Sequence, residues 1–204
     1  GTFEEWSLLG LSLRFKAGAM GIPSIPTKSM LGSDLEKIRG LKRFTCPYSG
    51  EEMLLVPAVN PDVAIIHSQI ADKYGNAQIF GPPCLDIDTA KAANRVILTT
   101  EQIVDNEHIR DAPNSTNIPF FCVDAVVEFP FGCYPHECYG RYEPAYEKLG
   151  EYGQGLLQAE DKIGFVREYL DKYFYQPADF EEYLELFGVR SLLETTRRGR
   201  IWPQ

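Results

Sequence analysis

A short polar stretch near the start of the chain, PTKSMLGSD at residues 26–34, combines residue types that grip an anion. Hydroxyl groups, an ammonium group and backbone N–H groups beside a flexible glycine can hold a carboxylate or a phosphate. The spacing does not match a nucleotide phosphate loop, so an ordinary polar loop is the alternative. The candidate substrate-binding residues are Thr27, Lys28, Ser29, Gly32, Ser33 and Asp34.

A histidine, His67, interrupts an apolar run within NPDVAIIHSQIADKYGNAQIFGP, residues 60–82. A hydrogen-bonded histidine of the core is the plain interpretation, because an apolar residue would suit a buried strand better. The run is followed by a turn in which Gly75 can adopt positive φ and Asp72 can accept hydrogen bonds from the turn backbone. The pattern predicts a hairpin at Asp72–Asn76.

The segment Cys133–Cys138 contains two cysteines and His136, which are the usual ligand types for zinc. Three ligand types within six residues, with Pro135 among them and no obvious fourth ligand nearby, are a poor match to known zinc spacings. We therefore expect a packed loop and no metal.

The remaining patterns predict a layered α/β protein. Thr2 and Glu5 have the spacing of a capping box, so a helix is expected from Thr2 to Gly21, with Glu4 and Glu5 on its first turn. Runs rich in β-branched or aromatic residues predict strands at 54–59, 63–70, 77–80, 95–100 and 122–129. Several runs are apolar at consecutive positions, which favours strands covered on both faces. Helices are expected at 86–94, 162–174 and 179–187.

Composition limits the partners and the compartment. The 204 residues are 44% hydrophobic and carry a formal charge of −9, which argues against nucleic acid or an anionic membrane as the main partner. Five scattered cysteines and the absence of a leader or a long apolar run favour a reduced cytoplasm. The length predicts one domain over residues 1–204. Because Gly1 leads directly into a helix-like pattern, we expect further residues upstream.

Four segments, in order, resemble the α subunit of family I coenzyme A transferases of the glutaconate type. They are LRFKAGAMGIPSIPTKSMLGSD, VPAVNPDVAIIHSQIADKYGNAQIFGP, IPFFCVDAVVEFPFG and YPHECYGRY, and the tail DFEEYLELFG extends the likeness. The resemblance covers nearly the whole chain and implies an open, mostly parallel sheet with helices on both faces and a C-terminal helical segment at 161–188. Relatives carry an upstream glycine-rich βα segment that nothing here matches, so the domain is expected to lack its N-terminal part.

The resemblance also implies a reaction. CoA would move between an acyl-CoA and a carboxylic acid by ping-pong transfer, without a metal or redox cofactor and with the nucleophilic glutamate on a β subunit. This chain would shape the acid pocket through residues 27–34. His67 matches a strand-end histidine of the glutaconate type, which implies that His67 anchors the loop carrying Asp72, Gly75 and Asn76 beside the cleft, so these four residues are the expected cleft-supporting residues.

Two rival functions follow from related proteins. Hydrolases of CoA thioesters in the same family use an acidic residue near the position of Glu5, so Glu5 would be catalytic if the chain were a hydrolase. The other rival is a non-catalytic effector-binding module of related fold, which would be attached to a DNA-binding segment. Dependence on an acceptor acid separates the transferase from the hydrolase.

Overall fold

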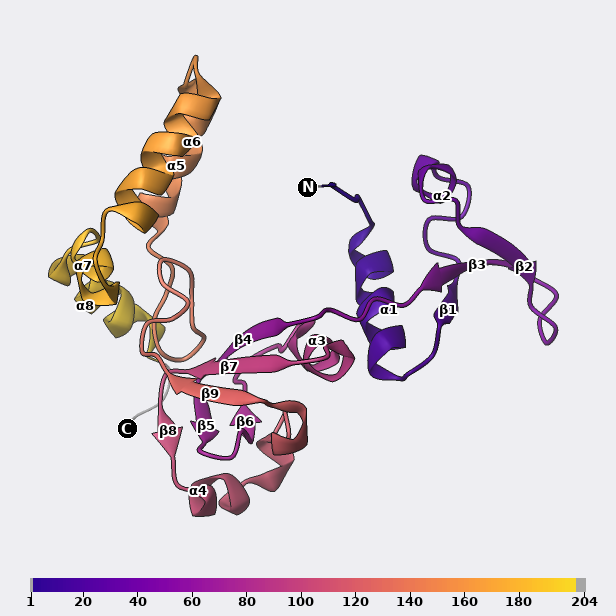
Figure 1. The fold of residues 1–204 in the computed structure, drawn as a ribbon, viewed down its shortest axis with the longest axis horizontal. Coiled ribbons are helices and arrows are strands. Elements are labelled where there is room, and N and C mark those ends of the chain that lie inside the picture. Colours follow the sequence, from indigo (N-terminus) through magenta and orange to yellow (C-terminus); the bar gives the residue numbers. More distant parts are fainter. Residues whose placement is uncertain (1, 201–204) are drawn as a thin grey trace. The chain divides into compact units, whose positions relative to one another are not determined.

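The structure, a computed structural model, describes residues 2–200 and divides into two compact units (Figure 1). The first unit ends at Pro130 and the second begins at Phe131. The single domain expected over residues 1–204 stays a prediction.

The first helix, α1 (Leu8–Ala19), begins later than the capping-box pattern predicts. Ser7 is its N-cap, and the Ser7 hydroxyl accepts a hydrogen bond from the Gly10 N–H at 3.0 Å. Residues 2–7 are not helical, so the helix start predicted at Thr2 and Glu5 is wrong. Ser7 takes the cap because it directly precedes the turns whose small residues are buried, while residues 2–5 are exposed.

Helix α1 packs against α3 (Asp86–Ala92) through a glycine contact. A Cβ atom added at Gly18 would lie 2.4 Å from the Val59 carbonyl oxygen and 2.9 Å from the Ala92 Cβ. The Asn60 side chain donates to the Ala92 carbonyl oxygen at 2.9 Å and closes the same junction. Only a residue without a side chain fits at position 18.

An antiparallel sheet in the order β1-β3-β2 follows α1. Its strands are β1 (Ser24–Thr27), β2 (Lys42–Thr45) and β3 (Glu52–Pro57), and the short helix α2 (Asp34–Ile38) lies between β1 and β2 in the sequence. Leu54 and Val56 of β3 are fully buried and form a cluster with Met30. The strand predicted at 54–59 corresponds to β3, whereas β1 and β2 were not predicted.

A parallel sheet in the order β4-β7-β9 forms the centre of the first unit (Figure 1). Its strands are β4 (Ala64–Ser68), β7 (Val96–Thr100) and β9 (Ala125–Glu128). One face carries Ile66 and Leu98 into the main apolar cluster, and α3 packs on β4. The register places Ile65 beside Ile97 on the other face, where Ile65 is 74% exposed.

A third small sheet, in the order β6-β5-β8, carries the predicted hairpin. Its strands are β5 (Ile70–Asp72), β6 (Ala77–Gln78) and β8 (Ile103–Val104), and β5 pairs antiparallel with β6 and parallel with β8. The run predicted as one strand at 63–70 divides at Gln69, whose side-chain oxygen accepts from the Phe80 N–H at 2.9 Å. Helix α4 (Asn106–Asp111) and two 3-10 turns, η1 (Pro113–Ser115) and η2 (Phe120–Cys122), complete the unit.

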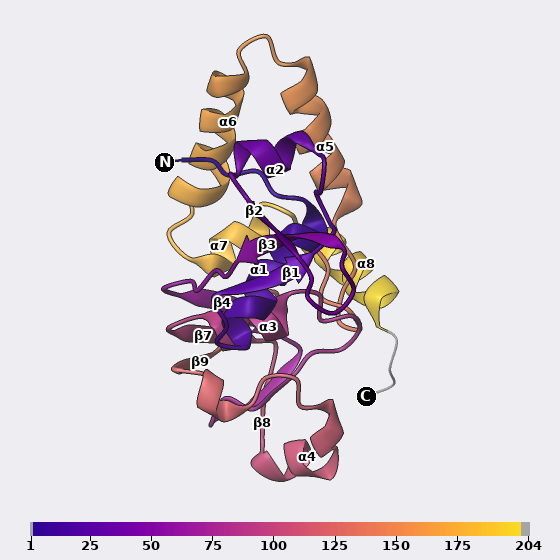
Figure 2. The same cartoon turned by 90° about the vertical axis from the view of Figure 1, so that its right-hand side faces the viewer.

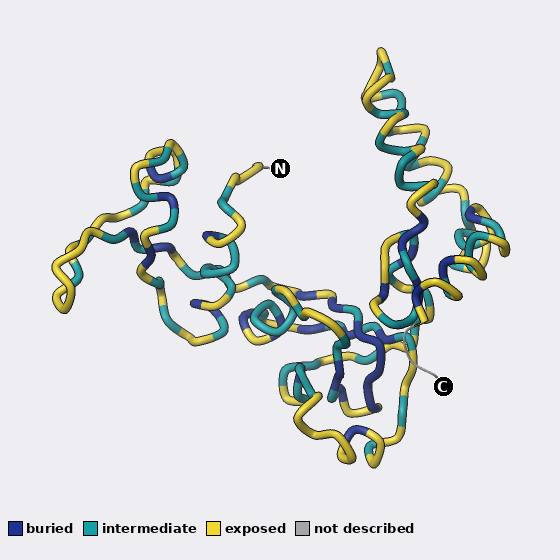
Figure 3. The backbone as a smooth tube through the Cα atoms, turned by 180° about the vertical axis from the view of Figure 1, so that it is seen from behind, coloured by how far each residue is buried: buried dark blue, intermediate teal, exposed yellow. Residues whose placement is uncertain are grey.

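The second unit is helical. It contains α5 (Tyr146–Gln158), α6 (Lys162–Leu170), a π-helical turn η3 (Asp171–Tyr175), α7 (Phe180–Glu185) and α8 (Val189–Gly199). Helices α5 and α6 lie side by side, as Figure 2 also shows, and neither has a buried residue, so the hairpin is teal and yellow in Figure 3. Helices α5 and α8 were not predicted.

An aromatic cluster organises the rest of this unit. Tyr134, Tyr142 and Phe187 are buried in it, and the Tyr134 and Phe187 rings meet edge to face with centroids 5.0 Å apart. The Tyr183 hydroxyl donates to the Tyr134 carbonyl oxygen at 3.0 Å. Asp179 caps α7 by accepting from the Glu182 N–H, as the sequence pattern predicts.

The expected fold class is confirmed as mixed α/β with a parallel sheet and C-terminal helices. Within residues 2–200, no helix combines the length and the hydropathy that crossing a bilayer requires.

Candidate functional site

The candidate substrate loop, Thr27–Asp34, connects β1 to α2 and contains two residues with positive φ. Gly32 has φ of 78°, which glycine adopts without strain. Met30 has φ of 70°, an uncommon conformation for a residue with a side chain. Its side chain is buried with Leu54 and Val56, and its Cε atom would lie 2.8 Å from a Cβ added at Gly10. Burial of Met30 therefore anchors the middle of the loop to the first sheet.

The loop is closed by its own hydrogen bonds. The Ser29 N–H donates to the Thr27 hydroxyl at 3.0 Å, and the Leu31 N–H donates to the Lys28 carbonyl oxygen at 3.2 Å. The Ser33 N–H and hydroxyl both donate to the Met30 carbonyl oxygen, at 3.0 and 2.6 Å. These bonds give the loop a defined shape without a ligand.

A carboxylate that the sequence did not single out holds the Gly32 N–H. Glu36 accepts from this N–H at 2.6 Å, and it also accepts from the guanidinium group of Arg43 on β2. Hydrogen bonds from Arg43 and then from Gly32 hold the pKa of Glu36 below its ordinary value. Residues 36 and 43 are seven positions apart on different elements, so no local pattern links them.

The side chains at the loop surface are more accessible. Lys28 forms an ion pair with Glu51, and both side chains are more than half exposed. The hydrogen bond from Lys28 lowers the pKa of Glu51. The Ser29 hydroxyl lies 3.4 Å from the Ser7 hydroxyl, while Asp34 lies on the exposed start of α2. An exposed ion pair costs little to break, so Lys28 can exchange Glu51 for another carboxylate.

The second group of predicted residues lies at the carboxyl end of the parallel sheet. His67 Nε2 donates to Glu101 Oε1 at 2.8 Å, and His67 Nδ1 lies 2.8 Å from the Thr99 hydroxyl. Thr99 belongs to β7 and Glu101 follows it directly, so His67 is bonded to the neighbouring strand. It is not bonded to the turn at Asp72–Asn76. Thr99 and Glu101 were not predicted as site residues, although RVILTTE ends an apolar strand with polar groups at the edge where ligands bind in such sheets.

The predicted turn between β5 and β6 is confirmed. The carboxylate of Asp72 is buried, and one of its oxygens accepts from the N–H groups of Tyr74 and Asn76, both at 2.9 Å. The other oxygen accepts from the side chains of Asn76 and Asn106, both at 2.7 Å. Burial alone would raise the pKa of Asp72, but these hydrogen bonds outweigh it and lower the pKa. Gly75 has φ of 101° and approaches the Val123 side chain.

Glu5 lies in the non-helical segment before α1 and is exposed. Its neighbour Glu4 makes the ionic contacts, with one carboxylate oxygen 3.5 Å from Arg14 and 3.6 Å from Arg39. The carboxylate of Glu5 is therefore accessible to solvent and to a ligand.

The loop at Cys133–Cys138 is packed among aromatic residues. The Cys133 N–H donates to the Tyr142 hydroxyl at 3.0 Å, and the buried Cys138 pairs with Tyr142 through an isolated β-bridge. None of the cysteines, all of which fall within residues 2–200, forms a disulfide.

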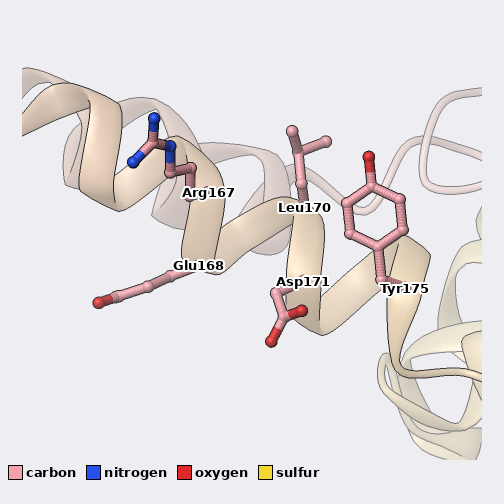
Figure 4. Close-up of a pocket in the computed structure, with 5 residues that line it drawn as sticks. All are labelled: Arg167, Glu168, Leu170, Asp171 and Tyr175. Atoms are coloured by element: carbon pink, nitrogen blue, oxygen red, sulfur yellow. The ribbon is translucent and has the colours of Figure 1, made fainter.

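A shallow hollow in the second unit is lined by side chains of one helical segment (Figure 4). Its residues are Arg167, Glu168, Leu170, Asp171 and Tyr175. All five belong to the consecutive segments α6 and η3, so no other element contributes a lining residue to the hollow. A ligand would be contacted from one side only, and the hollow is therefore not the candidate site.

The structure therefore gathers the predicted residues into two groups within the first unit. Residues 27–34 lie at the antiparallel sheet, where Glu36 and Arg43 join them. His67 lies at the edge of the parallel sheet, and Asp72, Gly75 and Asn76 form the turn of the third sheet. The expected cleft-supporting role of this second group stays a prediction.

The chain is similar in sequence and in structure to known proteins of one family. The sequence pattern of the family described as Coenzyme A transferase matches residues 2–129. A protein of Archaeoglobus fulgidus, named only as uncharacterized, is 47% identical over 95% of this chain and 42% of its own length. The A subunit of glutaconate CoA-transferase from Acidaminococcus fermentans is 33% identical, over 94% of this chain and 64% of that protein.

A hydrolase and a solved structure also match. The IpdA subunit of the cholesterol ring-cleaving hydrolase of Rhodococcus jostii is 32% identical over 63% of this chain and 48% of that protein. The crystal structure of glutaconate coenzyme A-transferase from Acidaminococcus fermentans superposes with a TM-score of 0.84 and 31% identity, covering 94% of this chain and 65% of that chain. The chain thus spans between about two fifths and two thirds of the length of these proteins.

Proposed function

The chain belongs to the coenzyme A transferase family, and its relatives there include the A subunit of glutaconate CoA-transferase. We propose that it forms the α-subunit part of an enzyme that moves CoA between an acyl-CoA and a carboxylic acid. The observation that supports this proposal most is the likeness to the glutaconate CoA-transferase relative along 94% of the chain, together with the shared fold. Family membership also favours an enzyme over an effector-binding module.

The proposed chemistry is a ping-pong exchange at a glutamate of the partner β subunit. The glutamate carboxylate attacks the acyl-CoA thioester, CoA thiolate leaves, and an acyl-glutamyl anhydride forms. The thiolate then attacks the glutamyl carbonyl, releasing the first acid and leaving a glutamyl-CoA thioester. An acceptor carboxylate repeats these steps in reverse and leaves as its CoA thioester. No metal or redox cofactor is required.

The contribution of this chain is proposed to be the acid pocket. The hydroxyl of Ser29 and the ammonium group of Lys28 are the loop groups best placed to meet an anion, because the Gly32 N–H and the Ser33 hydroxyl are held by acceptors that fix the loop, whereas Lys28 pairs with an exposed carboxylate. Likeness to the glutaconate enzyme favours a dicarboxylic or 3-oxo acyl chain, and Lys28 would pair with a distal carboxylate after leaving Glu51.

The test is thioester exchange between acetyl-CoA and isotopically labelled glutaconate or acetate, with the isolated chain and with the full α chain combined with its β subunit. We expect no transfer by the isolated chain and acceptor-dependent transfer by the complex. Lys28→Ala in the complex should lower transfer to glutaconate by about a hundredfold, the scale of a lost charge-stabilising donor, and should spare acetate.

Lys37→Ala is the matched control, since Lys37 is also an exposed lysine but pairs only loosely with Asp34 on α2. Equal loss with both acceptors would reject the pairing of Lys28 with a distal carboxylate. If the isolated chain catalyses transfer and Glu5→Gln abolishes it, the assignment of the nucleophilic glutamate to the partner subunit is rejected.

Hydrolysis of a CoA thioester is the second candidate, favoured by the accessible Glu5 together with the likeness to the IpdA subunit. It predicts consumption of acyl-CoA without any acceptor acid and loss of that activity in Glu5→Gln. Dependence on the acceptor would reject it.

A further inference from the structure

The carboxylate of Glu36 links the substrate loop to the first sheet. Its residue is only 8% exposed, which is unusual for a glutamate unless it is paired. One oxygen receives the Gly32 N–H at 2.6 Å and Arg43 Nη2 at 3.0 Å, while the other meets Arg43 Nε. Glu36 thus joins a backbone N–H of the loop to a guanidinium group held on a strand.

Arg43 is fixed on its strand independently of the loop. The register of β2 and β3 places Arg43 opposite Leu54, which belongs to the buried cluster that anchors Met30. A second carboxylate, Glu52, lies 3.4 Å from Arg43 and is mostly exposed. The two-point contact of Arg43 with Glu36 restricts the orientation of the Glu36 carboxylate, as bidentate contacts between arginine and a carboxylate do.

The loop therefore has two anchors on either side of Leu31. Met30 holds it through apolar burial, and Glu36 holds it through the N–H of Gly32. Gly32 has no side chain and positive φ, so without the carboxylate its peptide plane would turn easily. Turning that plane would redirect the Leu31 carbonyl oxygen and the Gly32 N–H while Ser33 stays bonded to the Met30 carbonyl oxygen, so it would change the surface that the loop presents between Met30 and Ser33.

We propose that Glu36 and Arg43 are positioning residues for substrate binding: together they fix the peptide plane of Gly32 and so the shape that the loop Thr27–Asp34 presents to the acid. They act through the loop and do not touch the reacting atoms. The functional part of this inference rests on the proposed function, whereas the ordering of the loop does not.

The test uses the full α chain combined with its β subunit, with four variants of the α chain: Glu36→Ala, Glu36→Gln, Arg43→Ala and Arg43→Lys. Hydrogen exchange at the Gly32 amide measures loop order, and exchange at residues 96–100 reports whether the parallel sheet is intact. We expect faster exchange at Gly32 in both alanine variants with unchanged exchange at 96–100. The KM for glutaconate should rise by roughly tenfold to a hundredfold, the scale of a misplacement of about 1 Å, with a smaller change in kcat.

Conservative variants that keep part of the contact distinguish a positioning role of Glu36 and Arg43 from an effect of their charges alone. Glu36→Gln keeps an acceptor for the Gly32 N–H, so it should raise KM less than Glu36→Ala, and Arg43→Lys should do less than Arg43→Ala. Glu52→Gln is the matched control: it removes the other carboxylate near Arg43 and should change neither exchange nor KM.

Each outcome decides the inference. Unchanged exchange at Gly32 in Glu36→Ala would refute the ordering of the loop. Faster exchange with unchanged KM would refute the role in substrate binding and leave a purely structural pair. A wild-type complex without transfer activity would instead reject the proposed function, and exchange at Gly32 would still test the loop.

Discussion

Removing the carboxylate of Asp72 should destabilise the first unit more than any exposed charge change. The carboxylate is buried and receives four hydrogen bonds, two from backbone N–H groups and two from side-chain amides. In Asp72→Ala these donors lose their acceptor where water has little access. Because an unsatisfied buried donor costs about 1–3 kcal/mol and relaxation recovers part of it, we expect a loss of about 3–5 kcal/mol.

Asp72→Asn gives a smaller, pH-dependent loss. The amide oxygen can still accept from the two N–H groups, but its NH₂ group faces the NH₂ groups of Asn76 and Asn106, so we expect about 2–3 kcal/mol. The hydrogen bonds lower the pKa of Asp72 in the folded chain, so its carboxylate stabilises the fold above the ordinary aspartate pKa. The difference from Asp72→Asn should therefore shrink as the pH falls below about 4.

Urea unfolding followed by circular dichroism measures both variants, with hydrogen exchange at the Ala77 amide as a probe inside the first unit. Asp62→Ala, a change at an exposed aspartate of the same unit, serves as the control and should stay within about 0.5 kcal/mol. A loss below about 1 kcal/mol for Asp72→Ala would refute the reasoning, since it would mean that the turn finds other acceptors at no cost.

Two further changes test the packing. Gly18→Ala should destabilise the first unit by about 1–3 kcal/mol, because the added Cβ meets the backbone at the junction of α1 and α3. Gly150→Ala is the control: its Cβ would meet open space, so it should stabilise the helix by up to about 1 kcal/mol. Equal thermal unfolding of the two variants would contradict the close contact at Gly18. Burial, then the neighbouring tyrosines, raises the pKa of Tyr183 to about 12, so its contribution to stability is complete below about pH 10 and is lost as the pH rises through 12. Burial also raises the pKa of Tyr169, so ultraviolet titration should show a late step whose amplitude falls by one tyrosine in Tyr183→Phe, and an unchanged amplitude at the highest pH would assign that ionisation elsewhere.

Features that depend on a few neighbouring residues could be predicted from the sequence. The turn at Asp72–Asn76 and the cap of α7 at Asp179 require only a side chain that bonds to the nearby backbone. The same reasoning misplaced the start of α1, because Thr2 and Ser7 both offer a cap and burial of the following turns decides between them.

Elements formed by tertiary pairing were missed. Strands β1 and β2 read SIPT and KRFT, which are poor strand sequences, and pairing with β3 makes them strands. Helix α5 contains glycines that lower helix propensity, yet Gly155 lets the Phe165 ring approach to where a Cβ would lie 2.7 Å away. The contacts of Glu36 with Arg43 and of His67 with Glu101 cross between elements, so the sequence carries no local sign of them.

The π-helical turn η3 has a consequence for how related sequences align. The Gln176 N–H donates to the Asp171 carbonyl oxygen five residues back, so this turn holds one residue more than an α-helical turn. The wider turn lets Tyr173 contact both Tyr169, at 4.6 Å between ring centroids, and Phe187, at 5.5 Å. Because the wide turn takes up the extra residue, deleting one residue here would restore a regular helical turn and leave the phase of the chain after it nearly unchanged. Homologues with a one-residue gap at 171–175 should therefore keep the phase of the chain after the turn but differ at the position of Tyr173, whose contacts with Tyr169 and Phe187 depend on the wide turn.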